Sequence, residues 1–220
     1  MTADARSLAR LFERVSLAIV AAPTRWHARQ WALFLAVAAT TSLAYVAKWP
    51  LQASVQSVGG GAARAVALFI DSYGDGFAVT LAGFAVLFAG RLLHKPTFVE
   101  AALVLGAAGI WCWIFTKTGQ LVLAERRPKD GGAMFFFALD GHGVSGHASA
   151  AGLVFAPVRD VLGRGATPRA RRIATMALLA WAILVGWSRV WLGMHFVWNV
   201  LLGLAIGFFT GGIGGRRSQS

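Results

Sequence analysis

The sequence predicts an all-α fold, a polytopic membrane helical bundle of about six transmembrane helices with an N-terminal amphipathic segment. Of the 220 residues, 57% are hydrophobic and only 14% are charged, which is too little charge to cover a soluble domain of this size. The apolar residues also form long blocks, and about 20 consecutive apolar residues cross the hydrocarbon core as a helix. Because a helix satisfies its own backbone hydrogen bonds in lipid, helices are expected throughout.

Three parts follow one another along the chain. Residues 1–30 are expected to be a cytoplasmic basic amphipathic segment, because Arg6, Arg10 and Arg14 recur every four residues, as on a helix at a membrane surface. Residues 31–213 form the transmembrane domain and residues 214–220 a basic C-terminal tail. The expected membrane helices are six apolar blocks, at residues 31–47, 76–93, 97–116, 146–162, 173–187 and 196–213.

A less hydrophobic stretch, residues 51–70, follows the first block and is rich in Gly, Ser, Gln and Ala. It is expected to be a re-entrant or interfacial helix with a break at the glycines of residues 59–61. The single cysteine, Cys112, lies inside an apolar block and excludes both a disulfide framework and a cysteine-based metal site.

The positive charges predict the orientation of the bundle. The formal net charge is +12, and the cations lie between the apolar blocks, where they meet lipid head groups or phosphates rather than nucleic acid. With both termini in the cytoplasm, 14 of the 21 Lys and Arg residues lie inside. The outside segments hold Lys48, Arg64, Lys117, Arg126, Arg127, Lys129 and Arg189.

Three polar segments on the outer side carry the residues expected to do chemistry. They are Glu125-Arg126-Arg127-Pro128, then residues 141–147, and then Ser188-Arg189 followed by His195 and Asn199. Arginines, a serine, histidines and glycine N–H groups at one end of a bundle are what a phosphate site requires. Taken alone, the arginines are more typical of a solvated interface and His195 of a packing histidine. The three segments together favour a phosphate site.

The order and internal spacing of these segments resemble the three signature motifs of the type 2 phosphatidic acid phosphatase superfamily, which also contains vanadium haloperoxidases. The family pattern is Lys-x6-Arg-Pro, Pro-Ser-Gly-His and Ser-Arg-x5-His-x3-Asp. The resemblance covers roughly residues 76–213. The chain reads Gln120-x6-Arg127-Pro128, Val144-Ser145-Gly146-His147 and Ser188-Arg189-x5-His195-x3-Asn199.

The resemblance implies a role for each matching residue. His195 is the nucleophile that forms a phosphohistidine, and His147 protonates the leaving oxygen and then activates water. Asn199 stands where the family has the aspartate that orients this nucleophile. No metal or other cofactor is implied, because the arginines neutralise the phosphate. The phosphoryl oxygens are held by Arg127, Arg189, Ser145 and the Gly146 N–H.

The sequence departs from the family pattern in two supporting charges. Gln120 replaces the lysine and Asn199 replaces the aspartate, while Val144 replaces the proline of the second motif. Asn199 is still able to accept a hydrogen bond from an imidazole N–H through its oxygen. Lys117 lies three residues before Gln120 and is expected to share its helix face, where it supplies the absent ammonium.

A four-residue spacing places His195, Asn199, Gly203, Gly207 and Gly211 along one face of the last helix. Three small residues at this spacing predict close packing on another helix. His195 and Asn199 are therefore expected to point into the bundle and not at lipid.

The expected function is hydrolysis of a lipid phosphomonoester or diphosphate at the periplasmic face of the bacterial inner membrane, with both termini cytoplasmic. Candidate substrates are polyprenyl diphosphate, phosphatidic acid, phosphatidylglycerol phosphate and lipid A phosphate. Two alternatives remain open: a lipid phosphotransferase, and a weak or inactive relative that only binds lipid phosphate. The expected partners are the bilayer and the lipid substrate, without nucleic acid, and the sequence does not predict an oligomeric state.

Overall fold

The computed structural model describes residues 3–23, 27–135, 137, 141–163 and 167–217, and most of these residues are helical. Each of the six apolar blocks forms one helix, so the prediction of a membrane helical bundle is confirmed. A two-stranded antiparallel hairpin of β1 (Ala124–Glu125) and β2 (Met134–Phe135) follows α6. The helices are α1 (Ala3–Val20), α2 (Ala28–Val46), α3 (Lys48–Gln56), α4 (Gly61–Tyr73), α5 (Gly76–Leu92), α6 (Pro96–Val122), α7 (Gly146–Gly163), α8 (Pro168–Trp191) and α9 (Val197–Arg217).

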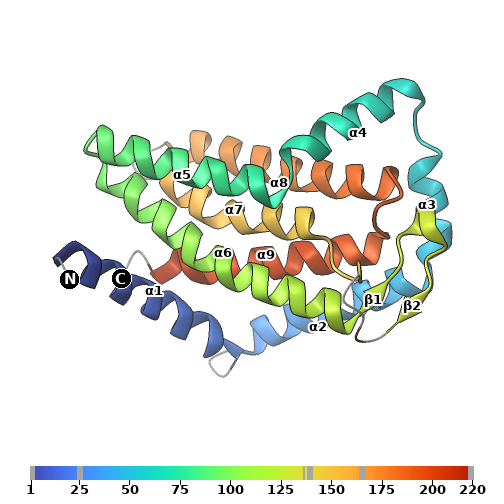
Figure 1. Cartoon of the computed structure of the whole chain (residues 1–220), viewed down its shortest axis with the longest axis horizontal. Coiled ribbons are helices and arrows are strands. Elements are labelled where there is room, and N and C mark those ends of the chain that lie inside the picture. Colours follow the sequence, from blue (N-terminus) through green and yellow to red (C-terminus); the bar gives the residue numbers. More distant parts are fainter. Residues whose placement is uncertain (1–2, 24–26, 136, 138–140, 164–166, 218–220) are drawn as a thin grey trace.

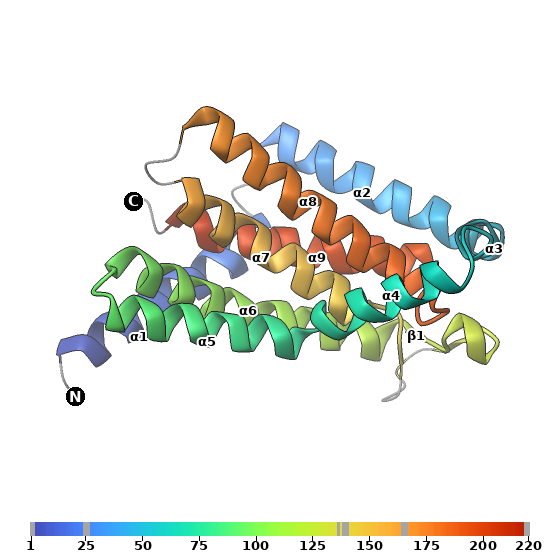
Figure 2. The ribbon, with the colours of Figure 1, turned by 90° about the horizontal axis from the view of Figure 1, so that it is seen from above.

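The long helices lie side by side along the longest axis of the molecule (Figure 1). Helix α7 is central and contacts α5, α6, α8 and α9. Both chain ends lie at one end of the bundle, whereas α3, β1 and β2 lie at the other. Helix α2 packs on α9, and α1 packs on both α6 and α9 (Figure 2). The three polar segments therefore share the end opposite the termini.

Among the described residues, two helices are long and apolar enough to cross a membrane alone, α6 and α8. Two bent pairs pass the same test together, α2 with α3 at 79° and α4 with α5 at 51°, which gives up to four spans. The less hydrophobic stretch of residues 51–70 is divided between α3 and α4, and the break expected at the glycines lies between these helices. Apolar side chains on α5, such as Phe84 and Phe88, are 64% and 72% exposed, as lipid contact requires.

Close packing of α7 on α9 confirms the small-residue face predicted from the glycine spacing. A Cβ atom at Gly203 would lie 2.5 Å from the Ser145 carbonyl oxygen. Cβ atoms at Gly207 and Gly211 would lie closer still to the carbonyl oxygens of Ser149 and Leu153. One glycine per turn of α9 thus meets one carbonyl per turn of α7. This contact fixes the start of α7 against the start of α9, where the second and third segments meet.

The two ends of the chain are helical beyond the expected boundaries of the bundle. Helix α1 packs on α6 and α9 through Val15 and Ile19, which are 0% and 1% exposed. Helix α9 continues to Arg217, so residues 214–217 of the expected tail extend this helix, and residues 218–220 lie outside the described residues.

Candidate active site

The second polar segment leads directly into the N-terminus of α7. The Ser145 side chain is fully buried, and its Oγ accepts a hydrogen bond of 3.4 Å from the Ala148 N–H, which makes it the cap of this helix. The Ser145 N–H donates to the Asn199 carbonyl oxygen at 3.1 Å. Gly146 and His147 begin the helix, whose first N–H groups have no helical acceptor and favour a bound anion.

A tight turn between α8 and α9 joins Arg189 to His195. Gly193 has a φ of +66°, a left-handed conformation that glycine adopts without strain. The turn brings the backbone N–H groups of Met194 and His195 to the Arg189 carbonyl oxygen, at 3.0 and 3.1 Å. The turn therefore holds the backbones of Arg189 and His195 close to each other.

The imidazole of His195 is buried in the tautomer that a nucleophile needs. Its residue is 5% exposed, and its Nδ1 lies 3.1 Å from the His142 carbonyl oxygen. Because a carbonyl only accepts hydrogen bonds, the proton resides on Nδ1, and Nε2 keeps its lone pair. The backbone of His142 thus performs the orienting role that the family gives to an aspartate.

Two arginines beside His195 present donors that lack acceptors. Arg127 follows β1, and its Nη1 lies 3.8 Å from the sulfur of Met194, the neighbour of His195. The Nε atoms of Arg127 and Arg189 are both buried without a hydrogen-bond partner in the described part of the chain. Leaving such donors unsatisfied is costly. An anion with several acceptor oxygens satisfies both groups.

The environment of His195 keeps its ring neutral. Burial lowers the pKa of His195 well below its ordinary value of 6.5, and the positive charges of Arg189 and Arg127 and the nearby His142 lower it further. The hydrogen bond to the His142 carbonyl acts in the opposite direction but is the smallest effect. A neutral imidazole at neutral pH is the form able to attack phosphorus.

The pH dependence of turnover follows from this lowered pKa. On the acidic side we expect kcat/KM to fall when the pH drops through the lowered pKa of His195, so this limb lies below pH 6.5. An Arg127→Gln variant loses one of the nearby positive charges, and its limb is expected to move to higher pH. Profiles of both proteins on the same substrate test this, because titration of the substrate is then common to both. A limb at or above pH 6.5 in the native protein, or no shift in the variant, contradicts it.

Asn199 has hydrogen-bond partners other than the one expected from the motif. Its Oδ1 accepts from the Phe196 N–H at 2.8 Å, and its Nδ2 donates to the Gly143 carbonyl at 2.9 Å and to Glu125 Oε2 at 3.2 Å. None of these hydrogen bonds goes to the His195 ring. The expectation that Asn199 hydrogen-bonds His195 is therefore corrected. Asn199 instead joins the start of α9 to the loop before α7.

A buried ion pair lies next to Asn199. Glu125 is 1% exposed, and its Oε1 accepts from Lys48 Nζ at 2.8 Å. The Glu125 carbonyl accepts from the His142 N–H at 3.0 Å, and the His142 carbonyl in turn contacts His195. Glu125, which contacts Asn199, and Lys48, which pairs with Glu125, thus place a carboxylate and an ammonium next to the altered third motif. Motif spacing gives no signal for either role.

Gln120 braces the second segment. Its Nε2 donates to the Val144 carbonyl at 2.8 Å, and its Oε1 accepts from Lys117 Nζ at 3.1 Å. Lys117 therefore does share the helix face of Gln120, as expected, and lies exposed at the end of α6. These contacts make Gln120 a support for the loop around Ser145.

Asp71, from α4, was not singled out by any motif. Its Oδ1 forms an ion pair with Arg189 Nη1 and lies 3.6 Å from His147 Nε2. It thereby joins a residue of the second segment to a residue of the third. A carboxylate from outside the motif region reaches two of the expected site residues.

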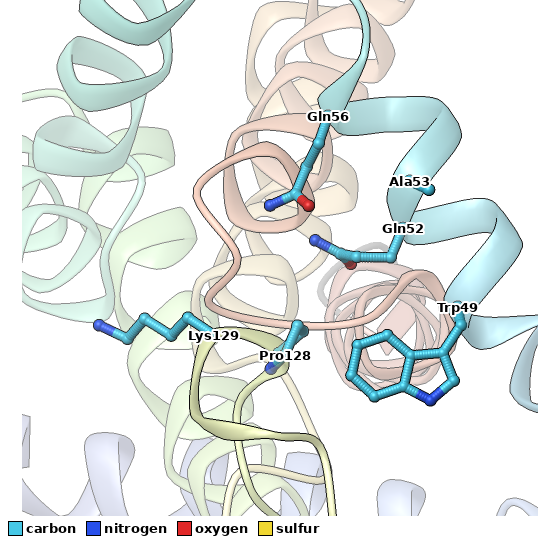
Figure 3. A pocket seen from close by; sticks show the side chains of 6 residues that line it. All are labelled: Trp49, Gln52, Ala53, Gln56, Pro128 and Lys129. Carbon is cyan, nitrogen blue, oxygen red and sulfur yellow. The ribbon is translucent and has the colours of Figure 1, made fainter.

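A cavity of about 160 Å³ lies beside the loop of the first segment. In Figure 3 two glutamines of α3 project toward the turn after α8, and the Lys129 side chain extends away from them. Gln52 Nε2 donates to the Val190 carbonyl at 2.6 Å, and Gln56 Nε2 to the Trp191 carbonyl at 3.2 Å. Helix α3 thus supports the chain immediately after Arg189. The cavity is lined by Trp49, Gln52, Ala53, Gln56, Pro128 and Lys129.

Comparison with known proteins shows which family the motif region matches. The sequence model described as the PAP2 superfamily matches residues 113–214, which contain all three segments. This match, over 102 of the 220 residues, is to the same superfamily that the motifs resemble. The resemblance inferred from the motifs is confirmed, although Lys48 and Asp71 lie outside the matched PAP2 region. No curated protein matches the sequence.

Two solved structures of other proteins are similar to this helical bundle in fold. One is a transmembrane PAP2 type phosphatidylglycerolphosphate phosphatase from Bacillus subtilis, with a TM-score of 0.56, 18% identity and coverage of 96% of each chain. The other is LpxE from Aquifex aeolicus, with a TM-score of 0.54 and 17% identity, covering 76% of this chain and 93% of that one. At these identities the likeness is one of fold.

Proposed function

We propose that the protein is a metal-independent membrane phosphatase that hydrolyses a phosphomonoester or diphosphate of a lipid. One observation carries the proposal: Arg127 and Arg189 hold buried, unpartnered Nε donors beside a neutral His195 with a free Nε2 lone pair. Fixed guanidinium groups around a phosphoryl group supply the charge neutralisation that a metal ion supplies elsewhere. The match of residues 113–214 to the PAP2 superfamily supports the same reaction class.

In the proposed reaction His195 Nε2 attacks phosphorus while the bond from phosphorus to the leaving oxygen breaks. His147 donates its proton to that oxygen, and the lipid alcohol or lipid phosphate departs. Water then attacks the phosphohistidine and gives its proton to His147, which releases inorganic phosphate and restores His195. Arg127, Arg189, Ser145 and the N-terminus of α7 hold the phosphoryl oxygens during both steps.

The proposed substrates are lipids with a terminal phosphate: polyprenyl diphosphate, phosphatidic acid, phosphatidylglycerol phosphate or a lipid A type phosphate. The structural neighbour from Bacillus subtilis is titled a phosphatidylglycerolphosphate phosphatase. We place the site at the periplasmic face of the bacterial inner membrane. This placement is supported by the site lying at the bundle end opposite both termini and by the predominance of cations in the inside segments.

A lipid panel tests the proposed function. Native protein purified in detergent is given each of the four lipid classes, with and without a metal chelator, and released phosphate is measured. We expect release from at least one lipid, unchanged by the chelator. Transfer of labelled phosphate to a second lipid instead of water indicates a phosphotransferase. No release from any lipid, or release that requires metal, contradicts the proposal.

A further inference from the structure

One carboxylate oxygen contacts two groups that the proposed mechanism reserves for the substrate. Asp71 Oδ1 forms an ion pair with Arg189 Nη1 and lies 3.6 Å from His147 Nε2. Arg189 is there to bind a phosphoryl oxygen, and His147 to protonate the leaving oxygen. A single oxygen in contact with both occupies the place of a substrate oxygen. Asp71 comes from α4, outside the PAP2 match.

We propose that Asp71 is a displaceable internal ligand of the phosphate site, and that it selects substrates by the charge of their phosphate group. In the free protein its carboxylate pairs with Arg189 Nη1, and an incoming phosphate group must displace it from that nitrogen. The inference rests on the proposed function only in taking Arg189 and His147 as phosphate ligands.

Competition of this kind favours doubly charged phosphate groups. A carboxylate and a phosphate use the same guanidinium donors, and two anions on one arginine repel each other. A phosphomonoester or terminal diphosphate carries up to two negative charges on that group and three acceptor oxygens. A phosphodiester carries one charge and has a substituent in place of one of these oxygens. The monoester therefore displaces Asp71 more readily than the diester does.

Selection against phosphodiesters matters for an enzyme that is surrounded by phospholipids. Phosphodiester lipids surround the protein at very high local concentration, and two unpartnered arginines would bind their head groups. A carboxylate of the protein that is always present protects Arg189 from such weak singly charged ligands. Terminal phosphates, which are the proposed substrates, still gain access.

The surrounding structure allows the carboxylate to move. Asp71 lies in the last turn of α4, and its side chain is 25% exposed. The helix ends at Gly74, where the chain bends by 51° into α5. Gly74 itself packs on Val185 of α8, which holds the end of α4 in place while the partly exposed Asp71 side chain rotates.

The test compares Asp71→Asn with a matched control, Asp75→Asn. Asp75 caps α5 by accepting from the Ala78 N–H at 2.6 Å, a role that asparagine retains. Binding of inorganic phosphate to protein in detergent is measured by calorimetry. We expect Asp71→Asn to bind phosphate about ten-fold more tightly than native protein, since one repelling charge is removed. Asp75→Asn also removes a negative charge that acts on His147, but one with no printed contact to Arg189, so it is expected to tighten phosphate binding less than Asp71→Asn does.

A second measurement addresses selection by charge. Phosphatidylglycerol in mixed micelles, a phosphodiester lipid, is expected to compete with phosphate in Asp71→Asn and not in native protein. An Asp71→Glu variant keeps the charge and is expected to remain weak in phosphate binding, which separates the effect from misfolding. Unchanged or weaker phosphate binding in Asp71→Asn overturns the proposal, as does a fall in kcat without any change in phosphate affinity. Because binding is measured, the result stands even if no lipid in the panel is hydrolysed.

Discussion

Restoring the family aspartate, by Asn199→Asp, is expected to destabilise the protein and to reduce phosphate release. The Asn199 amide donates to Glu125 and to the Gly143 carbonyl. An aspartate has no donor at these positions and places a second carboxylate against one that is 1% exposed. A buried like-charge contact together with two lost hydrogen bonds costs about 3–5 kcal/mol. The loop before α7 then loses its connection to α9.

A compensating substitution is expected to recover much of this loss. In Asn199→Asp with Glu125→Gln, the new amide donates to the new carboxylate, and one negative charge remains near Lys48. Glu125→Gln alone leaves the Lys48 ammonium beside a neutral amide and is expected to be destabilising as well. The double variant should therefore be more stable than either single variant, with a coupling of about 2 kcal/mol or more.

Thermal unfolding in detergent and phosphate release, measured on the four proteins of this cycle, give the coupling directly. Additive effects in the double variant contradict the proposed interaction between residue 199 and the carboxylate of Glu125. So does an Asn199→Asp protein that is as stable and as active as the native one. Lys117→Met, at the exposed end of α6, is the control for general effects of charge removal and is expected to change stability by less than about 0.5 kcal/mol.

Replacing the nucleophile, by His195→Asn, is expected to lower kcat by at least about 10³-fold, because no other group takes over the covalent step. Phosphate binding is expected to persist, since Arg127 and Arg189 remain. His94→Asn is the matched control. His94 lies between α5 and α6 with a φ of +51°, a conformation that asparagine tolerates. Equal activity in the two variants contradicts the role of His195.

The sequence predicts much of the fold because the signals for it are local. Blocks of apolar residues define the helices, and glycines at four-residue spacing identify the face of α9 that packs on α7. The same spacing correctly turns His195 inward, where it is 5% exposed.

Contacts between residues far apart in the chain could not be predicted in this way. Asp71 reaches Arg189 across 118 residues, and Lys48 reaches Glu125 across 77. Which side chain orients His195 is equally a matter of tertiary structure: the spacing suggested Asn199, and the structure places a backbone carbonyl there instead. The two departures from the family motif therefore look like losses in the sequence, whereas in the structure Asn199 contacts the carboxylate of Glu125, which pairs with the ammonium of Lys48.

The proposed mechanism requires that His195 carries the phosphoryl group between the lipid and water. Native protein is mixed with an intact lipid from the panel that it hydrolyses, labelled in its terminal phosphate. The reaction is quenched in alkali within one turnover, and the peptides are analysed by mass spectrometry. The account predicts an acid-labile phosphoryl group on His195 in native protein and none in His195→Asn. Phosphate release from native protein without label on His195, or equal labelling of the variant, contradicts it.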